Sequence, residues 1–251
     1  HLCPEGSLVS ALVEMRSISK RFGHITALTE IDLDLYKGEV LALLGDNGAG
    51  KSTLIKVLTG VYAPSSGEIH FEGRSVSLTS PSVARDLGIE TVYQDLALIP
   101  RMSIARNFYL GRELTKQVGP FRVLDRHAMN RGATEALREI GIDIRDTDEP
   151  VGSLSGGERQ SIAIGRAVHF GSQVLILDEP TSALSIGETR KVLGYIASAR
   201  ERGMSVIFIT HNLQHVFEVA DRLAVLTNGT KVGDFQRDEV TEAQVAEMIT
   251  S

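Results

Sequence analysis

The sequence predicts an α/β fold: a mainly parallel sheet with helices, an antiparallel β subdomain and a helical insertion. Two observations lead to this prediction. Short, continuously apolar runs recur along the 251-residue chain, and segments with apolar residues at helical spacing lie between them. Runs that are apolar at consecutive positions suit strands buried on both faces, as in a parallel sheet. Strands alternating with helices are typical of a layered α/β domain.

Each predicted element follows from one of these patterns. The buried strands are expected at residues 40–44, 89–93, 174–177, 206–209 and 223–226. Helices are expected after the Gly-rich stretch that precedes Leu54, after a predicted N-cap at Asp125, and around Ile162 and Val192. Two further segments favour antiparallel hairpins, namely 10–35 and 67–78. Residues 95–153 contain no strong strand signal, and we interpret them as a helical insertion.

Composition excludes several classes of protein. With 26 Lys plus Arg against 32 Asp plus Glu, the formal charge is −6, which argues against a basic surface for nucleic acid, so no nucleic-acid partner is expected. One cysteine cannot form an internal disulfide, which fits a reducing compartment. No apolar run approaches the roughly 18 residues that span a bilayer. Residues 1–12 are expected to be a flexible lead-in or cloning remnant, with the folded domain starting near Val13.

The strongest motif is GDNGAGKS, which directly follows the apolar run VLALL and precedes a helical segment. Glycines allow successive backbone N–H groups to turn inward at a helix N-terminus, and this arrangement binds phosphate. Lys51 is expected to reach the β- and γ-phosphates, and the Ser52 hydroxyl to ligate Mg²⁺. The alternative is a Gly-rich turn that only joins strand to helix. The predicted phosphate-binding residues are Gly45, Asp46, Asn47, Gly48, Ala49, Gly50, Lys51, Ser52 and Thr53.

Two adjacent carboxylates end the predicted strand in VLILDEP. Ligands of open parallel sheets bind at the carboxyl ends of the strands, where these side chains are expected. Asp178 would help to hold Mg²⁺ through its water shell, and Glu179 would polarise the water that attacks the γ-phosphate. A solvated acidic turn is the alternative interpretation.

A third motif, LSGGERQ, leads into another helical segment. Ser155 is a natural N-cap, and Gly156 with Gly157 allows another backbone to approach closely. The motif therefore predicts a second helix N-terminus suited to phosphate. An ordinary capped helix is the alternative.

In their sequence and their order these motifs resemble those of the ATP-binding subunits of ABC transporters. The resemblance covers the chain from about Val13 to the 230s. The resemblance rests on GDNGAGKS, Gln94 in VYQD, LSGGERQ, LILDEPTSAL and His211 in IFITHN. It implies a RecA-like P-loop NTPase core at 13–94 and 154–232, the insertion at 95–153 and a C-terminal helical segment at 233–251. It also implies a head-to-tail homodimer, in which Ser155, Gly156, Gly157 and Glu158 of one chain close over ATP held by the other.

The resemblance implies further roles for single residues. Gln94 would touch Mg²⁺ and link the ATP site to the insertion, and His211 would join Lys51 and Glu179 in catalysis by contacting the γ-phosphate. Phe22 would stack on adenine. Phe22 could instead be a core aromatic, Gln94 an ordinary polar residue, and His211 with His215 a zinc pair, although no third ligand accompanies the two histidines.

The D-loop departs from the commonest family pattern, since it reads Ser182-Ala183-Leu184-Ser185 where SALD is usual. Ser185 and Glu188 form an S-x-x-E capping box, so the start of the next helix is preserved. In the family, a coupling helix of a separate transmembrane permease subunit contacts the insertion beside Gln94. We expect this contact near residues 98–102.

The middle of the chain resembles bacterial importers of monosaccharides such as ribose, xylose or fructose. This implies a peripheral subunit on the cytoplasmic face of the plasma membrane, served indirectly by an external solute-binding protein. An amino-acid importer, a non-transport ABC ATPase acting on ribosomes or DNA, and another P-loop enzyme such as a small-molecule kinase are the alternatives.

Overall fold

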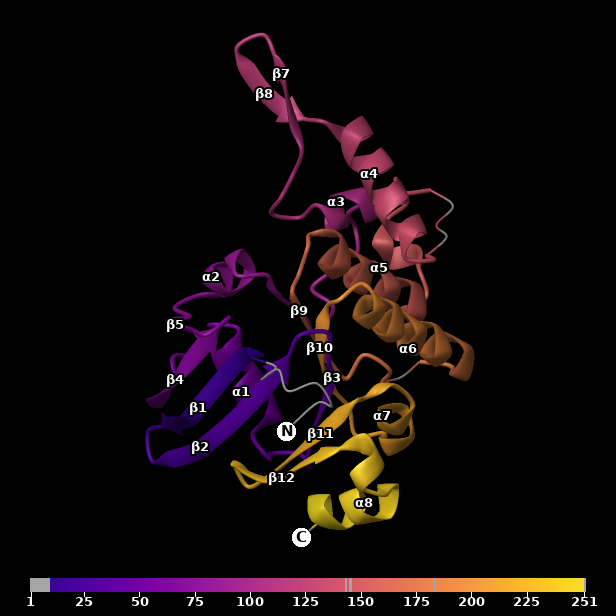
Figure 1. Ribbon diagram of the computed structural model, residues 1–251. Coiled ribbons are helices and arrows are strands. Elements are labelled where there is room, and N and C mark those ends of the chain that lie inside the picture. Colours follow the sequence, from indigo (N-terminus) through magenta and orange to yellow (C-terminus); the bar gives the residue numbers. More distant parts are fainter. Residues whose placement is uncertain (1–9, 143, 145, 183, 251) are drawn as a thin grey trace. The chain divides into compact units, whose positions relative to one another are not determined.

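The computed structural model describes residues 10–142, 144, 146–182 and 184–250. The chain divides into two compact units (Figure 1). The first comprises His1–Thr91, Ser172–Glu179 and Ile196–Ser251, and the second Val92–Gly171 and Pro180–Tyr195. Most of the expected lead-in and Ala183 of the D-loop lie outside the described residues.

A six-stranded sheet in the order β12-β11-β3-β10-β9-β6 organises the first unit. Its β11–β3, β3–β10 and β10–β9 pairs are parallel, as predicted, whereas β11 and β12 are antiparallel. Every residue of β3 and β10 is buried, which explains their continuous apolar runs. The strands are β3 (Val40–Leu44), β6 (Ile89–Val92), β9 (Val174–Asp178), β10 (Ser205–Ile209), β11 (Arg222–Thr227) and β12 (Thr230–Gln236).

The last strand corrects the prediction of a helical segment at 233–251. Residues 233–236 belong to β12, and only α8 (Glu242–Thr250) forms an α-helix there. β12 is a sheet edge without a single buried residue, so it lacks the apolar pattern of a central strand. Asn228 and Gly229 form its hairpin turn with φ of 49° and 76°, and this dipeptide was the available signal.

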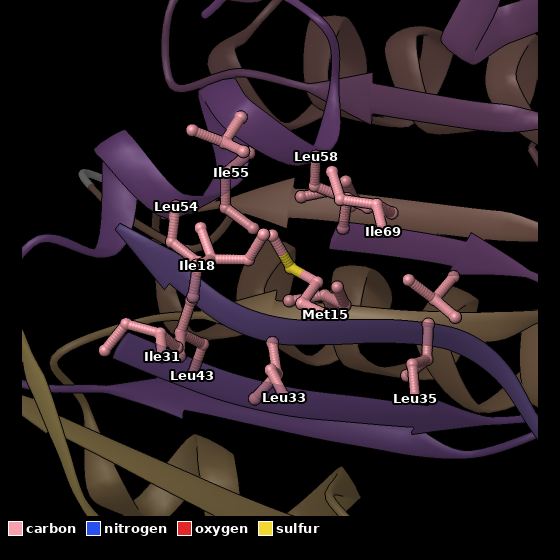
Figure 2. Packing of buried hydrophobic residues seen from close by; sticks show 14 of the residues in the cluster. Met15, Ile18, Ile31, Leu33, Leu35, Leu43, Leu54, Ile55, Leu58 and Ile69 are labelled. Carbon is pink, nitrogen blue, oxygen red and sulfur yellow. The ribbon is translucent and has the colours of Figure 1, made fainter. Parts of the chain in front are cut away.

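The predicted antiparallel subdomain is present as a four-stranded sheet in the order β2-β1-β4-β5. Its strands are β1 (Ala11–Phe22), β2 (Ile25–Tyr36), β4 (Ser66–Phe71) and β5 (Arg74–Val76). Figure 2 shows Met15 and Ile18 of β1 in one apolar cluster with Leu54 and Ile55 of α1 (Lys51–Leu58). All four side chains are at most 1% exposed, so this core fixes α1 against the sheet. The unit also contains α2 (Pro81–Asp86) and α7 (Leu213–Val219).

The second unit is mainly helical and has its own apolar core. Ile104, Phe108, Met129, Leu137 and Ile162 are among its buried residues. The predicted N-cap is confirmed, because Asp125 accepts a hydrogen bond of 3.1 Å from the amide of Ala128. The helices are α3 (Ile104–Phe108), α4 (Arg126–Glu139), α5 (Gly156–His169) and residues 186–195 of α6 (Ile186–Glu201). The unit therefore extends beyond the expected insertion at 95–153.

The interpretation of residues 95–153 as a helical insertion missed a hairpin. β7 (Thr115–Val118) and β8 (Phe121–Leu124) form an antiparallel hairpin that projects beyond the helices of this unit (Figure 1). All of its strand residues are exposed, so no buried face imposes an alternating pattern on them. Within the described chain, no helix is both long and apolar enough to cross a membrane.

Candidate active site

The strand register of the first unit gathers the predicted catalytic segments at one sheet edge. Ile209 of β10 pairs with Leu43 of β3 on one side and with Asp178 of β9 on the other. The strands are parallel, so the segments that leave them begin at the same edge. These segments are the Gly-rich loop after β3, Glu179 after β9 and His211 after β10.

The Gly-rich loop requires glycine at defined positions. Gly45, Gly48 and Gly50 have φ of 145°, 87° and 101°, which L-residues rarely adopt. Space is a second constraint at two of them. A Cβ on Gly45 would lie 2.3 Å from the carbonyl oxygen of Leu226, and one on Gly50 would lie 2.8 Å from Cδ2 of Leu28. The loop is therefore held closely against β11 and β2.

The N-terminus of α1 is open to an anion. Gly50 occupies the N-cap in a left-handed conformation, and no side chain of the described residues caps the helix there. The first turn contains no acidic residue, Ser52 is exposed and Thr53 is half-buried. Unsatisfied amide groups at a helix N-terminus favour phosphate or another anion.

Lys51 bends back over the loop. Its ammonium donates hydrogen bonds to the carbonyl oxygens of Gly45 (2.7 Å) and Asp46 (3.0 Å). Burial lowers the pKa of Lys51, while the nearby Glu179 and Asp178 carboxylates act in the opposite direction. The cation thus lies within electrostatic range of both carboxylates and beside the open helix end.

Asp178 and Glu179 have different surroundings although they are adjacent. Burial, followed by the charge of Glu179, raises the pKa of Asp178, and Lys51 partly offsets this. Glu179 takes a left-handed φ of 51°, and its amide donates to the carbonyl of Ile209 at 2.9 Å. Asp178 is thus the last residue of β9, whereas Glu179 has left the strand in a strained conformation.

His211 pairs with Glu179. Its Nδ1 lies 3.0 Å from Oε2 of Glu179, and 77% of the His211 side chain is exposed compared with 18% of that of Glu179. An imidazole at the surface therefore contacts a carboxylate that is largely withdrawn from water. Such a pair can orient a water molecule and a phosphate group at the same point.

The donor set at this edge fits Mg²⁺ and not a metal held by protein ligands alone. In the described parts of the chain, no group of three or more His, Cys, Asp or Glu side chains is arranged to hold a metal ion. Mg²⁺ usually takes one or two protein oxygen ligands together with waters and substrate phosphates. The Ser52 hydroxyl and the Asp178 carboxylate are donors of this type.

Phe22 lies at the end of β1 and is 41% exposed, so it is not a core aromatic. Its ring meets that of Tyr62 edge-on, with centroids 5.1 Å apart. The Lys20 ammonium lies 5.1 Å from the Phe22 ring and 5.5 Å from that of Tyr62. Sequence reasoning missed Tyr62, which follows α1 in an irregular segment without periodicity.

Gln94 and the LSGGERQ segment belong to the second unit, where Gln94 is exposed after β6. The predicted N-cap of α5 is confirmed. The Ser155 hydroxyl accepts from the Glu158 amide at 3.2 Å, and the Glu158 carboxylate accepts from the Ser155 amide at 2.8 Å. The predicted capping box of Ser185 and Glu188 is also present.

Gly229 is a residue of the site that sequence reasoning missed. Its amide donates to the carbonyl of Ala49 in the Gly-rich loop (3.1 Å), and its carbonyl accepts from the amide of Thr29 in β2 (2.8 Å). A Cβ at this position would lie 2.7 Å from the carbonyl oxygen of Ala27. The β11–β12 turn therefore links the phosphate-binding loop to the antiparallel sheet.

Comparison with a family model described as ABC transporter gives a match over residues 28–182, more than half of the chain. The chain belongs to the ABC transporter family. The Gly-rich loop, the Asp178–Glu179 pair and the LSGGERQ segment all lie within this match.

Relatives among characterised proteins cover most of the chain. The fructose import ATP-binding protein FrcA of Rhizobium meliloti is 49% identical over 88% of this chain and 86% of its own length. The xylose/arabinose import ATP-binding protein XylG of Sulfolobus acidocaldarius is 44% identical over 97% and 95%. The ribose import ATP-binding protein RbsA 1 of Burkholderia ambifaria is 41% identical over 95% of this chain, which spans only 46% of that protein.

Solved structures confirm the predicted fold. The ADP conformation of MJ1267, an ATP-binding cassette of an ABC transporter, matches 96% of this chain with a TM-score of 0.83 and 24% identity. The cbiO1 protein of Clostridium perfringens, part of the ABC transporter complex cbiONQ, matches 94% with a TM-score of 0.78 and 26% identity.

Proposed function

We propose that this chain binds ATP with Mg²⁺ and hydrolyses it to energise the uptake of a monosaccharide through an ABC importer. The observation that carries this proposal is the open N-terminus of α1 beside Lys51, at the same sheet edge as the Glu179–His211 pair. The fructose, xylose/arabinose and ribose import proteins among its relatives support the substrate class.

The residues of the first unit would divide the reaction between them. Loop amides and Lys51 would bind the β- and γ-phosphates, and Phe22 and Tyr62 would offer an aromatic surface for adenine. Ser52 and Asp178 would hold the Mg²⁺. When bound, the metal would supply positive charge beside the phosphates. Glu179 accepts a proton from water as the water oxygen bonds to the γ-phosphorus and the bond to the ADP oxygen breaks. His211 orients the γ-phosphate and Glu179.

Two copies of the chain would pair head to tail. The N-terminus of α5, with Ser155 at its cap, is a second phosphate-binding element that a single ATP bound at α1 does not require. In the pair, Ser155, Gly156, Gly157 and Glu158 of each chain close over ATP held by the other. Hydrolysis then releases the pair and transmits a movement to the membrane subunits.

Separate permease subunits would contact the second unit near residues 98–102. Ile104 and Phe108, which follow this segment, are buried in the core, whereas Ile99 is 42% exposed and available to a partner. A cavity of about 250 Å³ opens beside this segment, and its walls include Arg101, Arg106 and Met129. This surface combines apolar and cationic groups, which suits a cytoplasmic loop of a membrane protein. The chain would thus lie peripherally on the cytoplasmic face, with a solute-binding protein outside.

The test uses the chain purified together with its permease and reconstituted in vesicles with the binding protein. We expect ATP hydrolysis to be stimulated by one of a panel of pentoses and hexoses and not by amino acids. Stimulation by an amino acid alone would contradict the substrate class, and equal hydrolysis with every solute would contradict coupling.

A matched pair of variants tests the contact with the permease. The variant Arg106→Glu is expected to abolish transport and leave ATP binding intact. The same result is expected when Leu98 and Met102 are replaced by alanine. Arg138→Glu is the control, since it changes an exposed arginine in the last turn of α4, outside the cavity. Transport at the level of the unmodified protein in the Arg106 variant would exclude this surface.

A further inference from the structure

One carboxylate joins two segments of the second unit that lie far apart in the sequence. Oε1 of Glu188 accepts a hydrogen bond (3.1 Å) from the amide of Gly157, which lies in the LSGGERQ segment and in the first turn of α5. Oε2 of the same group accepts from the amide (3.0 Å) and the hydroxyl (2.8 Å) of Ser185 in the D-loop. The bonds from Ser185, followed by that from Gly157, lower the pKa of Glu188 to about 2. The group is therefore an anion at neutral pH, and its hydrogen bonds are charge-assisted.

This contact explains why the two glycines of the loop are not equivalent. A Cβ on Gly157 would lie 2.6 Å from both Cγ and Oε1 of Glu188. A Cβ on Gly156 would meet only Cδ2 of Leu184, at an ordinary 3.5 Å. Gly157 is thus required by the close approach of Glu188.

The same contact accounts for Ser185, the position at which this chain departs from the SALD pattern. The Ser185 hydroxyl donates to Glu188 Oε2. An ionised aspartate has no proton to donate, so its carboxylate would face that of Glu188 at close range, and the two negative charges would repel. Serine at 185 therefore supplies a hydrogen bond to Glu188 that an aspartate could not supply.

We propose that Glu188 is a positioning residue that holds the LSGGERQ segment at the start of α5 and the D-loop together as one element that meets the second chain. Its role in pairing rests on the proposed ATP-dependent dimer, but the contact itself lies within one chain. With the contact intact, the two loops approach the partner's nucleotide in a fixed relation, and pairing loses less conformational entropy than it would with two independent loops.

The first experiment measures hydrogen–deuterium exchange in the nucleotide-free monomer. Glu188→Ala is expected to raise exchange in both 154–160 and 182–188, and Glu188→Gln to raise it less, since its amide oxygen still accepts a bond. Ser185→Asp is expected to raise exchange in both loops through repulsion. The double variant Ser185→Asp with Glu188→Gln restores protection, because the Gln amide can donate to the new carboxylate. Asp125→Ala is the control, since it removes the N-cap of α4 in the same unit without touching either loop.

The second experiment measures ATP-dependent dimerisation of the same variants in a Glu179→Gln background, with nucleotide affinity of the monomer measured in parallel. Glu188→Ala and Ser185→Asp are expected to weaken dimerisation about tenfold or more, as for the loss of a hydrogen bond to a charged group. The affinity of these monomers for ATP is expected to be unchanged. The double variant is expected to recover most of the ATP-dependent dimerisation.

The outcomes separate this proposal from the proposed function. If the Glu179→Gln parent stays monomeric with ATP, the sandwich mechanism fails, and exchange alone decides on the Glu188 contact. If exchange in 154–160 and 182–188 is unchanged in Glu188→Ala, the contact does not hold the two segments together and the proposal is wrong. Tighter dimerisation of Glu188→Ala overturns the positioning role, because it would show that Glu188 blocks the loop.

Discussion

The N-termini of α1 and α5 are both predicted to bind phosphate, and they differ in how their amide groups are satisfied. At α1, the N-cap is Gly50, and none of the described side chains accepts a hydrogen bond from the first turn. At α5, Ser155 and Glu158 form a capping box, and Glu188 takes the amide of Gly157. The first amide groups of any helix have no partner within the helix. At α5 side chains of the chain itself accept from two of them, whereas at α1 they are left for a group from outside the chain.

In the proposed function, this difference means that one chain alone would bind nucleotide at α1 and not at α5. Two carboxylates already lie at the start of α5, so a phosphate that arrives there must be held by additional groups. In the proposed dimer those groups belong to the partner, whose own α1 holds the nucleotide. The predictions below test this asymmetry.

Replacing Lys51 with Ala is expected to have the largest effect. It removes a cation that lies beside the open end of α1, and charge-assisted hydrogen bonds of this kind contribute about 1.5–3 kcal/mol each. ATP affinity of the monomer, measured by calorimetry, should fall by about 10- to 100-fold. Lys191→Ala, an exposed lysine of α6, is the control. Equal affinities for the two variants would contradict the assignment of the site to α1.

The hairpin turn at Gly229 tests whether support of the α1 loop matters. Gly229 and Gly73 both follow a left-handed residue in a turn, with φ of 76° and 73°. An added Cβ meets Ala27 only at Gly229, whereas nothing lies within 4 Å at Gly73. Because both glycines have a positive φ, replacing either with alanine should lower the free energy of unfolding by about 1–2 kcal/mol through backbone strain.

Only Gly229→Ala should also weaken ATP binding, by about tenfold, because it displaces the loop carbonyl that Gly229 supports. Calorimetric titrations at a temperature where both variants are folded decide this. A similar loss of affinity in Gly73→Ala would mean that strain, and not displacement of the loop, is responsible.

Removing the cap of α5 should affect stability and pairing but not nucleotide binding by one chain. Ser155→Ala is expected to lower the free energy of unfolding by about 1 kcal/mol, as is usual for the loss of an N-cap. Ser155→Asp keeps the cap and should retain the stability of the unmodified protein. Denaturant unfolding and ATP titration of the monomer test these two statements. A weaker affinity of the Ser155→Ala monomer for ATP would contradict the claim that one chain binds nucleotide at α1 and not at α5.

The smallest expected effect is a pH dependence from Glu188. Its pKa falls from 4.5 to about 2 in the folded protein, so the stabilisation is fully present above pH 4.5 and is lost as the pH falls towards 2. Glu188→Gln lacks this contribution. In urea titrations the unmodified protein should exceed the variant in stability at pH 6, with the difference decreasing at pH 3. If the difference in stability between the two proteins were the same at pH 6 and pH 3, the charge of Glu188 would not contribute to stability.

Much of this architecture was predictable because buried central strands impose a continuous apolar pattern. β3, β9 and β10 follow it, and the glycines of the phosphate loop mark the turn into α1. The exposed hairpin β7–β8 and the edge strand β12 were missed, because neither has a buried face that would shape its sequence.

Local motifs predicted the site better than distant contacts. Ser155, Asp125 and the Ser185–Glu188 box interact with amides three residues away, so their spacing is visible in the sequence. Gly229 and Tyr62 act on residues far along the chain, and no local pattern links them. The bond from Gly157 to Glu188 likewise spans 31 residues and could only be found in the structure.

The measurement that tests the central claim most directly is the mass of the Glu179→Gln variant in solution, followed by analytical ultracentrifugation. This variant should bind ATP and Mg²⁺ at α1 without hydrolysing it, so the nucleotide persists. The account predicts a dimer with ATP and Mg²⁺ and a monomer with ADP or without nucleotide. A monomer whose α1 site is saturated with ATP would contradict the sandwich.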